Sequence, residues 1–235
     1  MNTQAAAADP RARIIIALDF ANREAALELV RQLAPHPGLF KIGLQLYTAA
    51  GPEIVRAVRE LGGRIFLDLK LHDIPNTVAR AVESASSLGV EMLTFHLSGG
   101  GAMIRAAAEA TTPEMLLLGV TVLTSSDEST LREIGLASPI AEQVVRLAKL
   151  GVENGINGLV ASARELAPLR SALGSEVKIV TPGIRSPGSA GDDQKRTMTA
   201  AEAFKAGADF LVIGRPITAA RDPRAALEGI VVDVV

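Results

Sequence analysis

The feature that most constrains the fold is a repeat of short apolar runs, each followed by a stretch in which apolar residues recur at helical spacing. The runs lie at residues 14–19, 39–43, 64–70, 92–96, 115–124, 158–161, 177–180 and 208–213. Continuous apolar runs are typical of strands buried on both faces of a parallel sheet. Eight strand-then-helix units in series predict the α/β class and a closed (β/α)8 TIM barrel, in preference to an open, doubly wound sheet.

The length of the chain fits one such barrel. An α/β barrel commonly occupies roughly 250 residues as a single unit, and this chain has 235 residues with no linker-like stretch. We therefore expect one barrel domain over residues 1–235. Within it, residues 1–12 are expected to be a poorly ordered N-terminal extension.

Composition argues against several classes of function. Lysine and arginine number 24 against 26 aspartates and glutamates, with one Tyr and no Trp, so neither the basic surface nor the stacking platform of a nucleic-acid binder is expected. The absence of Cys excludes a thiolate nucleophile and a cysteine metal site. No apolar run approaches the roughly 20 residues of a membrane helix, and the start lacks the pattern of a secretory signal. We expect a soluble, cytoplasmic protein with no nucleic-acid or membrane partner.

The third apolar run ends in a charged motif. Successive strand side chains point to opposite faces, so Asp68 and Lys70 are expected to share one face and lie side by side. Asp73 follows just past the strand, and Pro75 has the fixed φ of a first helical position. The charges therefore lie where a strand hands over to a helix, which is the catalytic rim of a parallel α/β barrel. Taken alone, the motif is equally consistent with a structural ion-pair network.

Other polar residues end other strands of the predicted barrel. Asp19 and His96 close the first and fourth runs, and Thr124 closes the fifth. Lys41 lies inside the second run, where a cation is costly unless an anion is near. All these strand ends meet at one mouth in a barrel, so together with the charged motif they predict a single site.

The loops after the seventh and eighth runs predict a phosphate site. Barrels often bind phosphate there, glycine lets backbone N–H groups approach an anion, and arginine can grip two phosphate oxygens. The candidate residues are Gly183, Arg185, Gln194, Gly214 and Arg215. The loop at 186–197 is longer than usual and rich in turn formers, so we interpret it as a mobile lid.

Four segments resemble a known family. They are Asp68-Leu-Lys-Leu-His-Asp-Ile-Pro-Asn-Thr77, Thr181-Pro-Gly-Ile-Arg185, Asp192-Asp-Gln-Lys-Arg196 and Gly214-Arg-Pro-Ile-Thr218. Together they resemble orotidine 5′-phosphate decarboxylases of the bacterial type, and the similarity spans nearly the whole chain. One departure is Leu97, after His96, where the family pattern leads us to expect a smaller residue.

The resemblance implies a reaction and a set of roles. The reaction is the loss of CO₂ from orotidine 5′-monophosphate to give uridine 5′-monophosphate in de novo pyrimidine synthesis, without cofactor or metal. Lys70, flanked by Asp68 and Asp73, would stabilise and protonate a carbanion-like C6. The resemblance also implies a homodimer in which Asp73 and Thr77 enter the partner's site. The substrate would be held by Asp19 and Lys41 at the ribose, Thr124 at the pyrimidine, Gln194 at base and phosphate, and Arg185, Gly214 and Arg215 at the phosphate.

Two other functions stay open. A Mg²⁺-dependent sugar-phosphate decarboxylase or aldolase of the same barrel superfamily would share the Asp-x-Lys-x-x-Asp core. Carboxylates and waters could hold its metal, although the three histidines lack metal-ligand spacing. A catalytically silent nucleotide-binding protein would need only the phosphate site. The intact Asp68, Lys70 and Asp73 argue against it, because charged groups that are costly to bury would most easily be lost.

Overall fold

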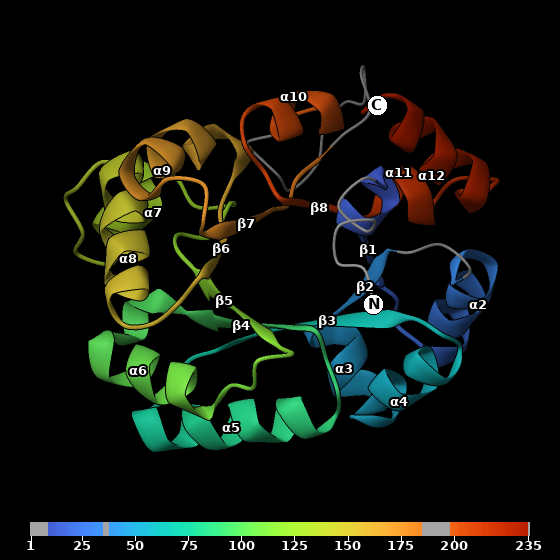
Figure 1. Ribbon diagram of the computed structural model, residues 1–235, viewed down its shortest axis with the longest axis horizontal. Helices are drawn as coiled ribbons and strands as arrows, with labels where there is room; N and C mark the ends of the chain where they lie inside the picture. The colour runs from blue at the N-terminus through green and yellow to red at the C-terminus, as the bar shows by residue number, and fades with distance from the viewer. Residues whose placement is uncertain (1–8, 35–37, 185–197, 235) are drawn as a thin grey trace.

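The protein is a closed barrel of parallel strands, seen in Figure 1 as a ring surrounded by helices. The computed structural model describes residues 9–34, 38–184 and 198–234. The strands follow one another around the ring in chain order, and β1 pairs with both β2 and β8. Their bounds are β1 Ile14–Ala17, β2 Leu39–Gly43, β3 Arg64–Leu71, β4 Met92–His96, β5 Leu116–Val120, β6 Gly158–Val160, β7 Lys178–Thr181 and β8 Phe210–Ile213. The predicted (β/α)8 fold is confirmed.

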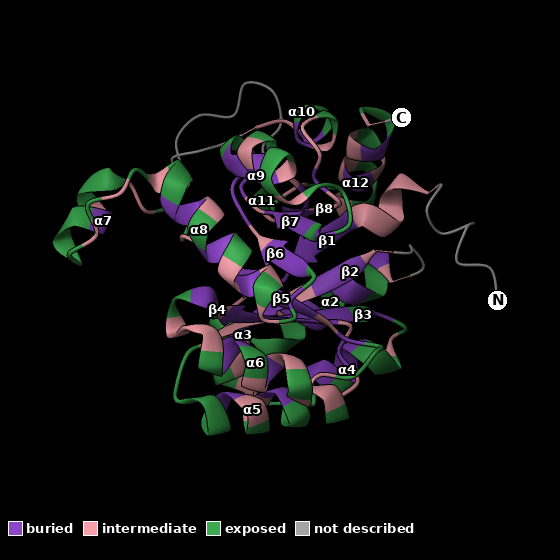
Figure 2. Ribbon diagram, turned by 60° about the vertical axis from the view of Figure 1, so that its left-hand side comes forward, coloured by how far each residue is buried: buried purple, intermediate pink, exposed green. Residues whose placement is uncertain are grey.

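Helices form the outer layer (Figure 1). The α-helices are α2 Arg23–Leu33, α3 Leu44–Ala50, α4 Glu53–Glu60, α5 Pro75–Ser87, α6 Gly101–Ala110, α7 Glu128–Glu133, α8 Ile140–Glu153, α9 Leu166–Leu173, α10 Ala200–Lys205, α11 Arg215–Thr218 and α12 Pro223–Val232. The 3-10 helices are η1 Pro10–Arg13, η2 Leu97–Gly99 and η3 Ala163–Glu165. Helix α7 lies in the polar segment between the fifth strand and α8, and Figure 2 shows it standing away from the barrel wall.

The first and last described elements are tied together. Nε and Nη2 of Arg11, in η1, donate to the Glu228 carboxylate of α12 at 3.2 and 2.6 Å. The Arg13 guanidinium donates to the backbone carbonyls of Ala208 and Asp209 at 2.6 and 2.9 Å. Within the extension expected over residues 1–12, the part from residue 10 onward is thus held against the barrel, and residues 1–8 lie outside the described range.

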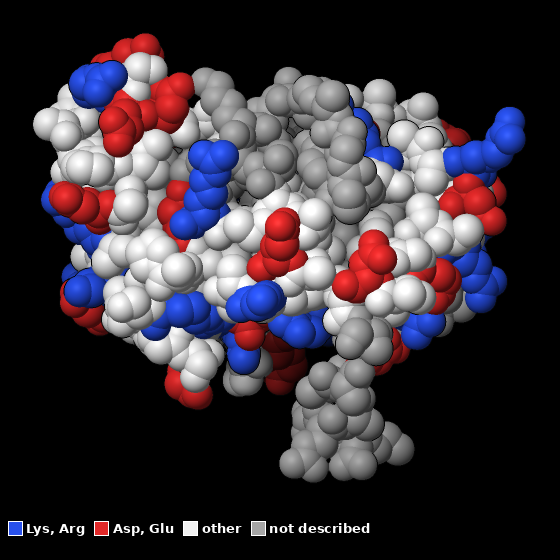
Figure 3. All heavy atoms as spheres, turned by 90° about the horizontal axis from the view of Figure 1, so that it is seen from above, with Lys and Arg blue, Asp and Glu red and all other residues white. Residues whose placement is uncertain are grey.

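Charges on the surface are mixed in sign. Figure 3 shows Lys and Arg interspersed with Asp and Glu over one face of the molecule. Within residues 9–34, 38–184 and 198–234, no helix combines the length and the apolar character needed to cross a bilayer.

The barrel interior has an apolar lower end and a charged upper end, where upper means the C-terminal ends of the strands. The apolar cluster inside the ring consists of Ile15, Ala17, Leu39, Phe66, Met92, Leu118, Val180 and Val212. A second, larger cluster fills the layer between strands and helices, and Figure 2 shows the strands as mostly buried. Strand alternation puts Asp68 on the same inward side as Phe66, but closer to the upper end. The charged motif therefore lies above the apolar cluster inside the ring.

Leu97 fills a space that two glycines leave open. It is fully buried, and a Cβ added at Gly119 on β5 would lie 2.6 Å from its Cδ2. A Cβ added at Gly151 on α8 would lie 3.0 Å from the same atom. Real Cβ contacts are rarely so short, so strand β5 and helix α8 lack side chains where Leu97 packs. The residue expected to be small is large here because its neighbours are small.

Candidate active site

A cavity of about 590 Å³ opens at the upper end of the barrel. Eight of the predicted site residues line it: Asp19, Lys41, Asp68, Lys70, Thr124, Gly183, Gly214 and Arg215. Strand β5 ends at Val120, so Thr124 lies in the following loop and not at a strand end as the run 115–124 predicted. The barrel thus brings residues of β2 and β3, and of the segments that follow β1, β5, β7 and β8, to one mouth.

Charges of alternating sign run along one side of this cavity. Lys70 Nζ lies 2.7 Å from Asp68 Oδ1, and Lys41 Nζ lies 3.7 Å from Asp68 Oδ2. Lys41 Nζ also lies 3.1 Å from Asp19 Oδ1. Gly43 makes room for this arrangement, because a Cβ there would lie 3.0 Å from Lys41 Nζ. The Lys41 side chain is only 11% exposed, and the anion it was predicted to need is supplied by two carboxylates.

Asp68 is ionised despite its burial. Burial alone would raise the pKa of the Asp68 carboxyl. The Lys41 and Lys70 ammoniums, with hydrogen bonds from Lys70 and Thr94, outweigh burial and lower that pKa below its usual value. A full negative charge therefore stands beside the Lys70 ammonium at neutral pH.

The backbone leaves the regular strand at Lys70. Its φ is 51°, and it is the only non-glycine residue with positive φ in the described part of the chain. Leu67 pairs with Leu93 and Leu71 pairs with Phe95, with a register shift between them. A left-handed backbone costs an L-residue roughly 1–2 kcal/mol, and such strain persists where the surroundings enforce it. Lys70 does lie beside Asp68 as predicted, but an irregular strand and not simple alternation puts it there.

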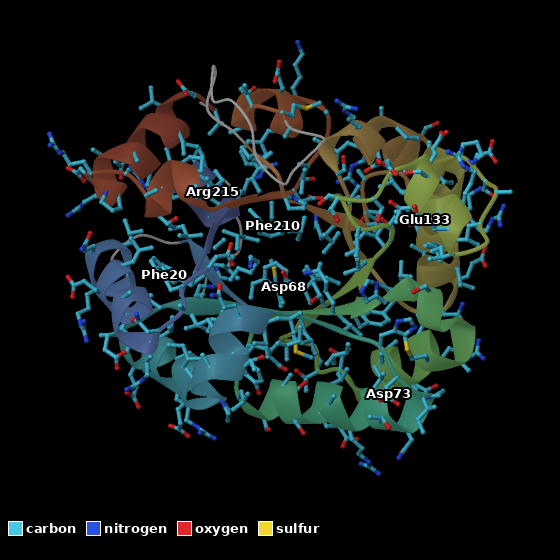
Figure 4. The ribbon with its side chains drawn as sticks, turned by 180° about the vertical axis from the view of Figure 1, so that it is seen from behind. Phe20, Asp68, Asp73, Glu133, Phe210 and Arg215 are labelled. Atoms are coloured by element: carbon cyan, nitrogen blue, oxygen red, sulfur yellow. The ribbon has the colours of Figure 1, made fainter. Side chains whose placement is uncertain are left out.

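The end of β8 forms the side predicted to bind phosphate. A Cβ on Gly214 would lie 4.0 Å from Asp19 Oδ2, so this end adjoins the line of charges. Figure 4 shows Asp68 inside the ring of strands and Arg215 at the α11 side of it. Gly183 also lines the cavity here. Arg185, Gln194 and the loop interpreted as a lid lie outside the described residues.

Asp73 and Thr77 lie outside their own chain's cavity. Both are exposed, and Figure 4 shows Asp73 near the start of α5, away from Asp68. The Ile74 backbone N–H donates to Asp73 Oδ1 at 2.6 Å. Asp73 therefore does not belong to the cavity wall of the single chain, whereas Asp68 does.

Two histidines lie next to the charged residues. The rings of His72 and His96 have centroids 5.5 Å apart. Burial lowers the pKa of His96, and nearby His72 and Lys70 lower it further against the opposing effect of Asp68. His96 is therefore a neutral ring at pH 7. In the part of the chain that the structure describes, no three His, Asp or Glu side chains are grouped to hold a metal ion.

Sequence reasoning missed Thr94. This residue is fully buried in β4, and its hydroxyl contacts both Asp68 and Lys70. A usable signal existed, because strand alternation puts Thr94 on the same inward side as Met92 and His96. Ser125 and Thr218, which also line the cavity, lie beyond the strand ends, where no such periodicity applies.

Known proteins resemble this chain over most of its length. The sequence profile of the Orotidine 5′-phosphate decarboxylase / HUMPS family matches residues 12–230. A protein named orotidine 5′-phosphate decarboxylase from Moorella thermoacetica is 51% identical over 231 residues, covering 94% of this chain and 92% of the relative. One of the same name from Opitutus terrae is 52% identical over 224 residues, covering 94% and 97%.

A solved structure supports the same assignment. The crystal structure of orotidine 5′-phosphate decarboxylase from Lactobacillus acidophilus superposes with a TM-score of 0.83 at 37% identity, covering 94% of this chain and 98% of that one. The fold, the sequence identity and the share of each chain covered all lead to the same family. The chain belongs to the orotidine 5′-phosphate decarboxylase / HUMPS family.

Proposed function

We propose that the protein removes CO₂ from orotidine 5′-monophosphate to give uridine 5′-monophosphate in the cytoplasmic synthesis of pyrimidines, without a cofactor. The observation that carries this proposal is the Lys70 ammonium, which lies 2.7 Å from ionised Asp68 at a cavity of about 590 Å³. Cavities of roughly 300–1,000 Å³ suit small-molecule ligands. Membership of the family supports the same reaction.

Lys70 supplies the charge that this reaction needs. Breaking the bond between C6 and the carboxylate releases CO₂ and leaves an electron pair in the plane of the pyrimidine ring. That pair is orthogonal to the π system, so a fixed positive charge must do much of the stabilising. Two unit charges about 4 Å apart interact by roughly 4 kcal/mol at an effective dielectric near 20. Lys70 Nζ then donates a proton to C6, and solvent returns a proton to the lysine.

The rest of the cavity holds the nucleotide. Asp19 and Lys41, joined at 3.1 Å, bind the ribose hydroxyls, and Thr124 binds the pyrimidine. Gly214 and Arg215 bind the phosphate, together with two residues outside the described range, Arg185 and Gln194. Binding energy gained at the phosphate, far from C6, orients the base against Lys70.

The proposal includes a homodimer with shared sites. Asp73 and Thr77 are exposed, and Asp73 lies outside its own cavity, which supports their entry into the site of a second copy. Ile74 between them is 66% exposed, as expected for an apolar side chain that a partner covers.

A mixing experiment tests the shared site. Lys70→Ala and Asp73→Ala should each be inactive alone, whereas each mixed dimer should contain one intact site. Mixing equal amounts under exchange conditions should therefore restore about a quarter of the native activity. Mass spectrometry of the mixed dimer is the control. Mixed dimers without recovered activity would contradict the sharing of Asp73.

The reaction itself is tested on purified, chelator-treated protein with orotidine 5′-monophosphate. Loss of the orotate ultraviolet absorbance and formation of uridine 5′-monophosphate are expected. Orotidine, which lacks the phosphate, is the matched control. It should react far more slowly, because it has no phosphate for Arg215 to bind. A turnover that appears only after Mg²⁺ is added would favour a metal-dependent sugar-phosphate enzyme instead.

A further inference from the structure

We infer that Thr94 is a positioning residue for the decarboxylation, because its hydroxyl fixes both the backbone of Lys70 and the carboxylate of Asp68. This inference rests on the proposed function. Thr94 is fully buried in β4 and does not line the cavity. It therefore acts on the reaction only through the two residues that it holds.

The first support is a gap in the pairing of β3 with β4. Leu67 pairs with Leu93 and Leu71 with Phe95. Three residues of β3, from Asp68 to Lys70, thus lie opposite the single residue Thr94. In a regular parallel ladder the Lys70 backbone N–H would bond a backbone carbonyl of a neighbouring strand. Here that N–H donates to Thr94 Oγ1 at 2.9 Å, so a side chain replaces the missing ladder bond.

The second support is the direction of the hydroxyl proton. Thr94 Oγ1 lies 2.9 Å from Asp68 Oδ1, and an ionised carboxylate can only accept, so the hydroxyl donates to it. The same hydroxyl accepts from the Lys70 N–H through a lone pair. The Thr94 hydroxyl thus donates to Asp68 and accepts from Lys70 at the same time. The two bonds together fix the orientation of the hydroxyl.

The two bonds converge on the ammonium of Lys70. Asp68 Oδ1, which Thr94 orients, also accepts from Lys70 Nζ at 2.7 Å. The Lys70 side chain is 30% exposed, so packing alone holds it less firmly than Asp68, which is 13% exposed. Lysine has many rotamers to lose when it is ordered. Thr94 therefore holds the lysine at its backbone directly and at its charged end through Asp68.

The left-handed backbone at Lys70 lies at the residue whose N–H Thr94 bonds. A residue at φ 51° returns to the extended region unless its neighbours prevent it. The Thr94 hydroxyl bonds the N–H of that very residue. Its removal should let Lys70 relax and move Nζ relative to C6.

The test compares variants that keep or lose the hydroxyl. Thr94→Val has the same shape but cannot form either bond, and Thr94→Ser keeps both. Thr121→Val is the matched control, because Thr121 is likewise buried but, among the described residues, donates only to the Val160 carbonyl at 3.2 Å. Thermal unfolding of each variant shows whether the fold survives. Should Thr94→Val not fold, Thr94→Ala is measured in its place.

The expected result is a fall in kcat with little change in KM. Misplacement of a catalytic group by about 1 Å can cost on the order of 100-fold, so Thr94→Val should lose roughly 10- to 100-fold in kcat. The affinity for uridine 5′-monophosphate should stay within about twofold, because no nucleotide contact is removed. Thr94→Ser should recover most of the rate, and Thr121→Val should match the parent. A merely structural role would instead lower stability and active fraction alike in both valine variants.

Crystal structures of Thr94→Val and the parent give a readout that needs no activity. The inference requires that Lys70 leaves the left-handed region or that Nζ leaves Asp68 Oδ1 in the variant. An unchanged Lys70 in the variant crystal, or an unchanged kcat, overturns it. Should the parent protein fail to decarboxylate orotidine 5′-monophosphate, the proposed function falls. The crystal comparison then still decides whether Thr94 sets the position of Lys70.

Discussion

The two ends of the barrel interior are made from the same alternating strands but meet opposite demands. At the lower end Leu39 and Met92 are buried in an apolar cluster, where burial contributes stability in proportion to area. At the upper end Asp68 and Lys70 are partly desolvated, and Lys70 has a left-handed backbone. Desolvated charge and backbone strain both oppose folding. The lower end therefore stabilises the fold enough for the upper end to hold unfavourable charge and backbone strain.

The largest effect expected at the upper end is loss of turnover in Lys70→Ala. A proton donor contributes typically 10²–10⁴-fold, and electrostatic stabilisation at the same atom adds to this, so kcat should fall by at least about 10⁴-fold. Binding of uridine 5′-monophosphate should survive, because the nucleotide contacts lie elsewhere. Absorbance assays and calorimetry measure the two quantities. Normal turnover in this variant would remove Lys70 from the reaction.

At the lower end, Leu39→Ala should reverse this pattern. Leu39 is fully buried, with 0% of its surface accessible to solvent. Truncating a buried leucine costs about 2–5 kcal/mol of unfolding free energy, whereas kcat of the folded fraction should be unchanged. Urea unfolding and active-site titration check the prediction. An active-site defect at full stability would show that the two ends are not separable.

A third substitution sharpens the picture of the upper end itself. Arg215→Ala should remove charge-assisted hydrogen bonds to phosphate worth about 1.5–3 kcal/mol. In kcat/KM for orotidine 5′-monophosphate this corresponds to a loss of roughly 10- to 150-fold. Orotidine, which has no phosphate, should react equally well with parent and variant. An equal loss for both substrates would mean that Arg215 does not bind the phosphate.

The smallest effect concerns pH. Burial lowers the pKa of His96, with His72 and Lys70 adding to that effect. The unfolded chain takes up a proton near pH 6.5, but the folded chain does so only at lower pH. Stability contributed by neutral His96 is therefore complete above about pH 6.5 and is lost as pH falls below it. Between pH 7 and 5, His96→Asn should lose less stability than the parent in denaturant titrations. Parallel stability curves for the two proteins would contradict the low pKa of His96.

Much of the fold could be predicted because each local signal was independent of distant contacts. Asn22 is of a residue type that caps helices, and its Oδ1 accepts from the Ala25 N–H at 2.9 Å. Thr199 and Glu202 have the Thr-x-x-Glu spacing of a capping box and form one at the start of α10. Ser162 caps a short 3-10 helix by accepting from the Arg164 N–H at 3.3 Å. The Ser-x-x-Glu spacing gives no sign that Glu165 is buried, because burial of a side chain depends on tertiary packing that a local pattern does not contain.

The candidate site was less predictable than the fold. The barrel prediction brought Asp19, Lys41 and Asp68 to one mouth, and all three line the cavity, since the ends of parallel strands meet there whatever their side chains. The left-handed backbone at Lys70 arises from a mismatch between two strands, so it could not be read from either strand alone. Alternation within β4 indicates that Thr94 faces inward, but its contacts with Asp68 and Lys70 depend on this mismatch between the strands.

The fit of Leu97 between Gly119 and Gly151 restricts the order in which these three positions can change. A methyl group at Gly119 would collide with the leucine and one at Gly151 would press tightly against it, whereas a smaller residue at position 97 would open the space. In related sequences, residue 97 must therefore become smaller before residue 119 or residue 151 can become larger. A homologue with a small residue at position 97 is free to carry alanine at 119, and a homologue with leucine is not.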